Sequence, residues 1–283
     1  MKVAIIGYGF VGKALSDGFL DTVEVLKIDP KLESNINEIT KFCPEIVFIC
    51  LPTPMKDDSS QDISIVKEVI KEISQINTNS LLVIKSTILP DNIEELSKLK
   101  KDFIYNPEFL REKHAKEDFI NSELIIFGGS EGSSHLLSEF YKNHTKCINT
   151  NHIFTDKITA SLIKYTINSF LATKVIFFNE INKIFESIDS KETWENFTKY
   201  LSRDKRIGDS HMMVPGHDGR LGFGGACLPK DINALVKYAE SKNIQLNLIK
   251  DVIKTNNKIR ASYNNTTHRE DEQNINYNNL DEE

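Results

Sequence analysis

The feature that most constrains the fold is a glycine-rich turn between two apolar runs near the N-terminus. Residues 3–6 are apolar and lead directly into Gly7-Tyr8-Gly9-Phe10-Val11-Gly12, and a helical pattern follows over residues 13–19. A second apolar run, residues 23–28, ends in Asp29. Strand, glycine turn, helix, strand and acidic residue is the order of a dinucleotide-binding unit. The chain is therefore predicted to begin with an α/β fold of the Rossmann type.

Each residue of this turn has its own predicted role. Gly7 makes the tight turn, Gly9 admits the pyrophosphate at the helix N-terminus, and Gly12 lets the helix pack closely on the strand. Asp29 is predicted to hydrogen-bond the ribose hydroxyls, which favours NAD over NADP. The residues predicted to contact the cofactor here are Gly7, Gly9, Phe10, Val11, Gly12 and Asp29.

Strand-like and helix-like segments alternate over residues 1–150, the predicted cofactor domain. Strands are expected at 3–6, 23–28, 46–50, 81–85, 103–105 and 124–127, and helices at 63–73 and 93–98. This alternation predicts a doubly wound parallel sheet, in which ligands bind beyond the C-terminal ends of the strands. The loops 51–54, 86–90 and 106–112 would bring hydroxyls and carboxylates to that edge, although ordinary proline turns would look the same.

A helical domain over residues 151–260 is predicted around one long helix, from residue 156 to about 188 with Thr155 as its cap. Apolar residues surround this helix on nearly all sides, so it must be buried, in part against a second copy of the chain. Its polar residues form one stripe, which is either functional or a solvent-facing edge. The stripe consists of Lys157, Ser161, Lys164 and Asn168.

The cysteine loop, residues 221–231, has the sequence Leu-Gly-Phe-Gly-Gly-Ala-Cys-Leu-Pro-Lys-Asp. Its glycines, at 222, 224 and 225, are expected to let the backbone come close to a ligand. Cys227 follows them, and Asp231 is expected to start a helix. A thiol at a helix N-terminus beside a lysine is the setting of a nucleophile, although a buried structural cysteine would give the same pattern.

Charge and composition exclude several classes of protein. The net charge of −6 is concentrated in residues 262–283, which hold one arginine and six acidic residues, so no basic field for nucleic acid remains. This Asn-rich tail, residues 261–283, is expected to be disordered. No apolar run reaches the ~18 residues of a membrane span. The four cysteines show no metal-ligand or disulfide spacing, which indicates a reduced, cytoplasmic protein without a metal.

Seven motifs in order resemble the UDP-glucose/GDP-mannose dehydrogenase family, and within it the bacterial UDP-glucose 6-dehydrogenases. The resemblance covers residues 1 to about 260. The motifs are GYGFVG, LPTP, KST, NPEFLRE, KYTINSFLATKVIFFNE, RIG at 206–208 and GFGGACLPKD. The resemblance implies oxidation of the primary alcohol of a sugar nucleotide, UDP-glucose for the 6-dehydrogenases, to a carboxylate in two NAD-dependent steps. A homodimer through the long helix is predicted separately, because its large apolar residues exceed what one small domain can cover.

The resemblance also implies residue roles. Cys227 would be the nucleophile that holds the substrate as a thiohemiacetal and then a thioester. Lys164 and Asn168 would stabilise the oxyanion and a water, Asp231 would assist proton transfer, and Glu108 would act near the reacting carbon. Further contacts to the cofactor are implied at Thr53, Thr87, Glu112 and Lys230, with Thr87 also near the chemistry. Contacts to the substrate are implied at Phe109, Leu110 and Gly224, and Arg206 and the loop 216–220 would lie near the substrate or the partner subunit.

The sequence departs from the family in two places. The stretch between Asp29 and residue 46 is shorter than is typical. After residues 255–263, the family would begin a third domain that binds the nucleotide of the substrate, and the Asn-rich tail stands there instead. The chain is therefore expected to be truncated or frame-shifted, or to borrow such a domain from another chain. The alternatives are a catalytically silent NAD-binding dimerisation module, or a dehydrogenase for GDP-mannose or a UDP-N-acetylhexosamine.

Overall fold

The computed structural model describes residues 1–76 and 79–278, which form two compact units. The first unit contains residues 1–53 and 62–164, and the second contains residues 54–61 and 165–283. The short segment 54–61 thus belongs with the C-terminal half of the chain. It forms a small hairpin, in which the Lys56 amide donates to the Ser60 carbonyl over 2.8 Å.

The first unit is built on a seven-stranded sheet with the order β2-β1-β3-β4-β5-β6-β7. Neighbouring strands are parallel except β5 and β6, which pair antiparallel. The prediction of a doubly wound, parallel-dominated sheet is confirmed, with this one pair as the difference. The strands are β1 (Lys2–Ile6), β2 (Glu24–Ile28), β3 (Ile46–Ile49), β4 (Leu81–Ile84), β5 (Ile104–Tyr105), β6 (Ile126–Gly128) and β7 (Ile153–Thr155).

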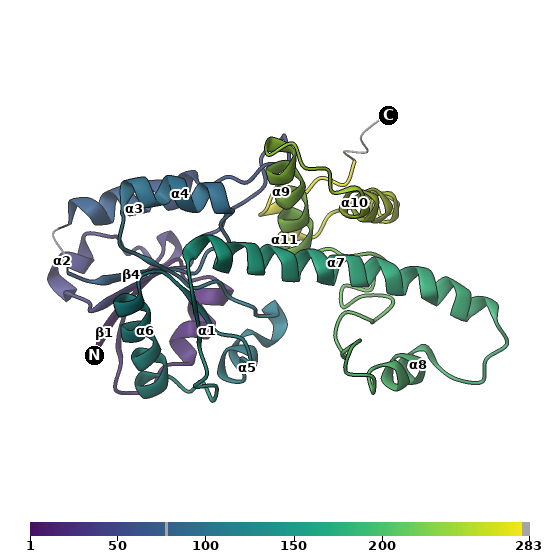
Figure 1. Ribbon diagram of the computed structural model, residues 1–283, viewed down its shortest axis with the longest axis horizontal. Coiled ribbons are helices and arrows are strands. Elements are labelled where there is room, and N and C mark those ends of the chain that lie inside the picture. The colour runs from purple at the N-terminus through teal and green to yellow at the C-terminus, as the bar shows by residue number, and fades with distance from the viewer. Residues whose placement is uncertain (77–78, 279–283) are drawn as a thin grey trace. The chain divides into compact units, whose positions relative to one another are not determined.

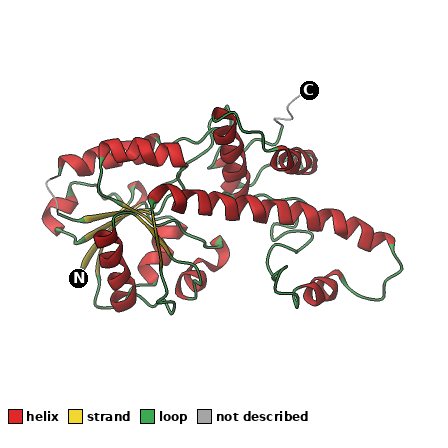
Figure 2. Ribbon diagram, in the orientation of Figure 1, coloured by secondary structure: helices red, strands yellow, loops and turns green. Residues whose placement is uncertain are grey.

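Helices cover both faces of this sheet (Figures 1 and 2). One core cluster joins one face to α2 (Glu38–Phe42), α3 (Ser64–Gln75) and α4 (Pro90–Leu99). The other joins the opposite face to α1 (Phe10–Asp17), α5 (Ala115–Ile120) and α6 (Glu131–His144). The register sets Ile6 level with Ile28 on β2 and with Ile49 on β3. The loops that follow these strands therefore leave from the same edge.

The predicted long helix is confirmed as α7 (Lys157–Ser187). Its cap differs from the expectation, because Thr155 lies in β7 and the Asp156 carboxylate instead accepts the Thr159 amide over 2.8 Å. Three of the four residues of the polar stripe, Ser161, Lys164 and Asn168, are buried and do not form a solvent-facing edge, while Lys157 is half-buried. No helix in the described part of the chain is both long enough and apolar enough to span a membrane.

The second unit packs α9 (Leu228–Ser241) and α10 (Asn247–Arg260) with the later part of α7, around Ala172, Ile176, Phe223, Ile232 and Val252. A separate aromatic cluster joins α7 to α8 (Trp194–Leu201). Helix α9 begins three residues before Asp231, where a start had been expected. Leu228 is its first residue, so Cys227 takes the N-cap position.

The prediction of a disordered tail is wrong for residues 262–278. This segment contains α11 (His268–Asp271) and buries Glu270, Ile275 and Tyr277. It also pairs with the hairpin 54–61, since the Met55 amide donates to the Gln273 carbonyl over 3.1 Å. Composition indicated too little apolar surface, but a buried ion pair of Arg260 with Glu270 fixes the segment. Residues 279–283, also part of that prediction, lie outside the described residues.

Candidate active site

The glycine turn after β1 leaves open space at one position only. Gly7 has φ +89°, and a Cβ there would lie 2.5 Å from the Cys50 carbonyl oxygen. A Cβ at Gly12 would lie 2.3 Å from the Gly7 oxygen. At Gly9, the N-cap of α1, no described atom comes within 4 Å of that position. The turn therefore has tight packing on both sides and room for a ligand at the helix N-terminus.

Asp29 follows β2 and is held against this turn. Its Oδ2 accepts the Tyr8 amide over 2.8 Å, and its Oδ1 accepts the Lys31 amide over 2.9 Å. Each carboxylate oxygen has two lone pairs, so both keep the capacity to accept a further hydrogen bond. The structure thus places an oriented carboxylate beside the open position at Gly9.

The loops after β3 and β4 are joined by two hydrogen bonds. Thr53 Oγ1 donates to the Thr87 carbonyl over 3.0 Å, and the Leu51 amide donates to Ser86 Oγ over 2.9 Å. Thr53 is buried, and Thr87 is half-buried at the same sheet edge as the glycine turn. These bonds fix the relative position of the two predicted cofactor contacts.

Lys164 and Glu108 form a buried pair within the first unit. Lys164 Nζ donates to the Glu108 carbonyl over 2.6 Å and to its Oε1 over 3.3 Å. Both side chains are less than one-tenth exposed. Glu108 Oε2 also accepts the Leu110 amide over 2.6 Å, and the ammonium lies 5.3 Å from the centre of the Phe109 ring. An ammonium and a carboxylate are therefore held together with little contact with water.

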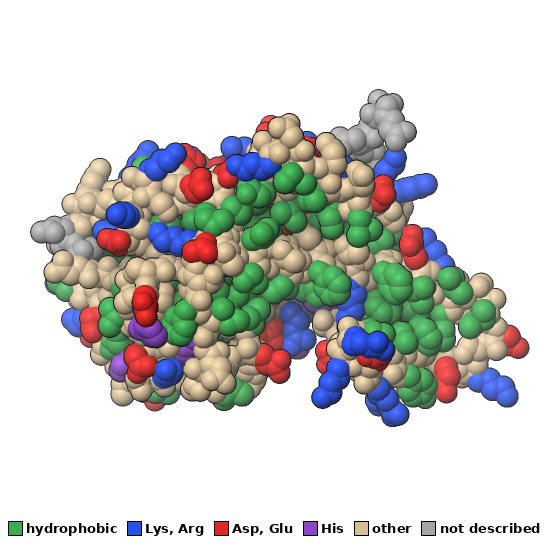
Figure 3. Space-filling model, in the orientation of Figure 1, with side chains coloured by type: hydrophobic (Ala, Val, Ile, Leu, Met, Phe, Trp, Pro, Cys, Tyr) green, Lys and Arg blue, Asp and Glu red, His purple; other side chains and the backbone are tan. Residues whose placement is uncertain are grey.

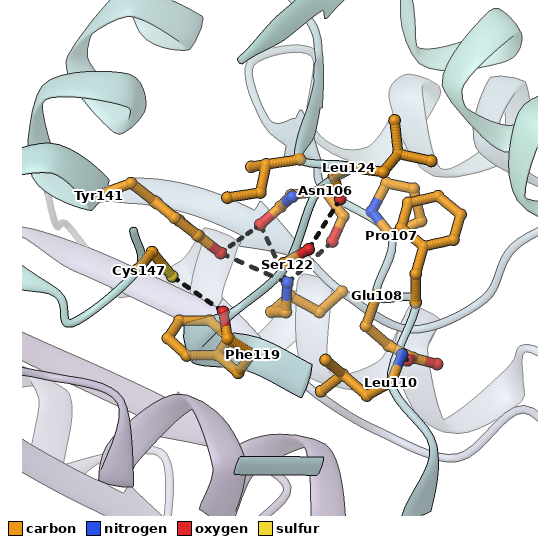
Figure 4. A pocket seen from close by; sticks show the side chains of 12 residues that line it. Asn106, Pro107, Glu108, Leu110, Phe119, Ser122, Leu124, Tyr141 and Cys147 are labelled. Atoms are coloured by element: carbon orange, nitrogen blue, oxygen red, sulfur yellow. Dashed lines mark hydrogen bonds between the residues drawn. The ribbon is translucent and has the colours of Figure 1, made fainter. Parts of the chain in front are cut away.

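A polar network that sequence reasoning did not assign lies behind Glu108 (Figure 4). Lys85 Nζ donates to Asn106 Oδ1 over 3.0 Å, and Tyr141 Oη donates to the same oxygen over 2.7 Å. Burial lowers the pKa of Lys85, although the nearby Glu108 raises it. These residues, with Cys147, line a cavity of about 20 Å³, which is room for roughly one water. Within the sequence, only the lysine of the KST motif, Lys85, could have indicated this network, because its partners Asn106 and Tyr141 are distant in the chain.

The second unit carries a separate buried group around Asp231. Asn168 Nδ2 donates to Asp231 Oδ2 over 2.6 Å, and Lys230 Nζ donates to Oδ1 over 2.6 Å. All three side chains are buried. Cys227 is half-buried at the N-terminus of α9, where its carbonyl accepts the Asp231 amide over 3.0 Å. Asp231 thus lies one helical turn after the thiol, with both carboxylate oxygens held.

The chain itself packs against one side of two glycines in the cysteine loop. A Cβ at Gly222 would lie 2.6 Å from Asn256 Oδ1, and one at Gly224 would lie 2.3 Å from Arg260 Nη2. These two positions need glycine because α10 packs against the side on which a Cβ would lie. Gly225 differs, with φ +78° and no described atom within 4 Å of its Cβ position.

Two predicted site residues lie outside these buried groups. The Arg206 side chain is 89% exposed and binds Asp204, whose hydrogen bond raises the pKa of the guanidinium. Glu112 is exposed at the start of the 3₁₀ helix η2 (Glu112–His114). Neither position is enclosed in the way that Lys164 and Asp231 are.

Comparison with known proteins gives two matches to domains of one family. Residues 26–145 match the NAD binding domain, and residues 158–258 the central domain, of the UDP-glucose/GDP-mannose dehydrogenase family. The chain is 33% identical to a UDP-glucose 6-dehydrogenase of Rickettsia felis, over 90% of this chain and 64% of that protein. It is 32% identical to the enzyme of that name from Rickettsia prowazekii, over 93% of this chain and 68% of that protein.

A solved structure has the same fold. The UDP-glucose dehydrogenase of Pyrobaculum islandicum superposes with a TM-score of 0.72 at 24% identity, over 91% of this chain and 68% of that chain. The chain thus spans slightly less than two thirds of the Rickettsia felis relative, and about two thirds of the other two proteins.

Proposed function

The chain belongs to the UDP-glucose/GDP-mannose dehydrogenase family, and on that premise we propose that it oxidises UDP-glucose to UDP-glucuronate with NAD. The family assignment rests on the two domain matches and on relatives named UDP-glucose 6-dehydrogenase. The observation that carries the proposal is the buried Asp231 carboxylate, held by Asn168 and Lys230 one turn after Cys227. A carboxylate in this position can accept and return a proton close to a nucleophilic thiol.

The residues of the first unit fit the binding of NAD. Gly9 leaves space at the N-terminus of α1, where backbone N–H groups favour an anionic pyrophosphate. Phe10 and Val11 open that helix, and the Asp29 carboxylate lies beside the turn to accept ribose hydroxyls. Bound NAD would supply the hydride acceptor for each of the two oxidations. Thr53, Thr87, Glu112 and Lys230 are proposed as further contacts.

Cys227 is assigned the role of the nucleophile that binds the substrate covalently. Its thiolate adds to the aldehyde carbon after the first oxidation, so the reactive aldehyde does not leave the enzyme before the second one. The addition gives a thiohemiacetal, and loss of a hydride in the second oxidation turns it into a thioester. Water then cleaves the thioester, which returns the thiol and releases the carboxylate. Asp231 accepts a proton from that water, while Asn168 fixes the direction of its Oδ2.

The oxyanion that forms at the reacting carbon is assigned to Lys164. Its ammonium is buried, and in such surroundings it acts on a developing negative charge more strongly than it would in water. Glu108 holds the ammonium and is proposed to position a water. Lys164 and Asn168 lie one turn apart on α7, so one helix carries both groups. Contacts to the substrate are also proposed at Phe109, Leu110, Gly224 and Arg206, with Gly224 contributing backbone only.

A homodimer is proposed through the exposed apolar stripe of α7. Phe170, Phe177 and Ile184 are 55–61% exposed and recur every seven residues. That spacing places them along one side of the helix. In Figure 3, hydrophobic side chains gather over the α7 and α8 region of the second unit. Large apolar side chains exposed along one side of a helix are typical of a surface that a second copy covers.

The test combines purified chain, NAD and UDP-glucose and follows NADH by absorbance. Two NADH for each UDP-glucose, with turnover lost in Cys227→Ser, would support the proposal. Turnover only with GDP-mannose or a UDP-N-acetylhexosamine would correct the substrate. No NADH with any of these sugars, while NAD binds normally, would show a silent NAD-binding module instead.

A further inference from the structure

The segment after α10 folds back onto the cysteine loop, and its Glu270 is completely buried there. We propose that Glu270 is a positioning residue for Cys227, because its carboxylate holds the Gly225 amide and so fixes the loop that leads to the thiol. The proposal deepens the proposed function and rests on the nucleophilic role of Cys227. Glu270 itself acts through the loop backbone and is not assigned a part in the chemistry.

Four donors meet the Glu270 carboxylate. Its Oε1 accepts from the Gly225 amide over 3.2 Å, from Arg260 Nη2 over 2.7 Å and from Tyr277 Oη over 2.6 Å. Its Oε2 accepts the Thr267 amide over 2.6 Å, as part of a capping box at α11. The carboxylate therefore joins three parts of the chain: the cysteine loop, the end of α10 and the C-terminal segment.

The groups around Glu270 favour the ionised form of its carboxylate. Burial raises the pKa of Glu270, but the hydrogen bonds from Tyr277 and Thr267 and the charge of Arg260 outweigh it and hold the pKa below its usual range. Arg260 is also buried and donates to Asp218 Oδ2 over 2.7 Å. A charge-assisted bond to a backbone amide is stronger than a neutral one, so the Gly225 contact is a real restraint on the loop.

Glu270 packs against one face of the cysteine loop, at Gly224. A Cβ at Gly224 would lie 2.5 Å from Glu270 Oε1 as well as against Arg260, so this face of the loop is filled. The next residue, Gly225, has an open Cβ direction. The segment thus supports the loop from behind and leaves the neighbouring face available for a ligand.

The loop needs this support because of its composition. Two consecutive glycines, Gly224 and Gly225, give the backbone more conformational freedom than any other pair, and Cys227 follows two residues later. A misplacement of a reacting group by about 1 Å can cost a rate roughly 10²-fold. Fixing the Gly225 amide is therefore a direct way to set the position of the thiol.

The experiment compares Glu270→Ala and Glu270→Gln with the matched control Glu272→Gln, whose carboxylate on the same segment pairs with Arg269 and His268 instead of the cysteine loop. Amide hydrogen exchange of residues 222–227 is measured on the full chain, together with kcat and KM. We expect about tenfold faster exchange in Glu270→Ala, a smaller change in Glu270→Gln, which keeps an acceptor, and none in the control. We expect kcat to fall roughly 10- to 100-fold, with KM for NAD unchanged.

Exchange at residues 222–227 that equals wild type in both Glu270 variants would overturn the proposal, as would a KM for NAD that changes as much as kcat. If Glu270→Ala fails to fold, Tyr277→Phe removes one donor and keeps the Gly225 contact, so it should show exchange close to wild type in this loop. The exchange measurement needs no turnover. Absence of NADH in wild type would therefore refute the proposed function while the role of Glu270 is still decided.

Discussion

Replacing Gly7 by alanine should destabilise the first unit through two separate effects. At φ +89° an L side chain is strained, which costs about 1–2 kcal/mol. The new Cβ would also lie 2.5 Å from the Cys50 oxygen and 2.8 Å from its carbonyl carbon, both backbone atoms at the end of β3. Such overpacking costs typically ~1–3 kcal/mol. Together these effects predict a loss of roughly 2–5 kcal/mol in the free energy of unfolding.

Gly9→Ala is the matched variant, because the same methyl group enters space that no described atom occupies within 4 Å. Gly9 has φ −75°, which alanine adopts without strain. We expect its stability to stay within about 0.5 kcal/mol of wild type. Its affinity for NAD should fall at least roughly tenfold, about 1.4 kcal/mol, because the methyl group lies where the pyrophosphate is proposed to bind.

Thermal unfolding by circular dichroism and titration calorimetry with NAD separate the two variants. For a protein of this size, Gly7→Ala should lower Tm by roughly 4–20 °C, and Gly9→Ala should leave it unchanged. A Gly7→Ala protein as stable as wild type would refute the steric argument. A Gly9→Ala protein that binds NAD as tightly as wild type would place the pyrophosphate elsewhere.

Three further outcomes are expected. Asp231→Asn keeps the shape of the side chain but cannot accept a proton, so kcat should fall about 100-fold or more while NAD affinity stays constant; unchanged kcat would exclude proton transfer by this residue. Burial lowers the pKa of Lys85, so the folded protein binds fewer protons than the unfolded chain below 10.5. The unfolding free energy of wild type relative to Lys85→Met should therefore rise in urea titrations as the pH rises toward the ordinary pKa of lysine, and a fall would contradict the assigned direction. Phe170→Glu places a charge on the exposed stripe of α7, so light scattering should show a monomer where wild type is a dimer; a monomeric wild type would remove that proposal.

Local sequence patterns were enough to predict the start of the fold. The spacing of Gly7, Gly9 and Gly12 depends on contacts within one βαβ unit, and the structure has the expected turn, helix and strand there. The long α7 was equally predictable, because its periodicity extends over 31 residues. The short strand β7 was missed, since three residues, two of them exposed, carry too little pattern.

The features that the sequence did not reveal depend on distant contacts. Composition predicted disorder after residue 261, because it does not record that Arg260 and Glu270 meet in a buried pair. In the cysteine loop, the sequence did not reveal that Asn256 packs against Gly222 and that Arg260 packs against Gly224. A glycine shows that something comes close to the backbone, and only the fold shows whether that is a ligand or the chain itself.

The pairing of Met55 with the C-terminal segment has a consequence for how this protein folds. The Met55 amide is satisfied by Gln273, and Asn274 Nδ2 donates back to the Met55 carbonyl over 3.2 Å. Closing a loop of that length costs roughly 5 kcal/mol in chain entropy. During synthesis, residues 54–61 must therefore wait, without these partners, until more than two hundred further residues have left the ribosome. The second unit can be completed only after Gln273 and Asn274 have been made, long after the segment 54–61 that it includes.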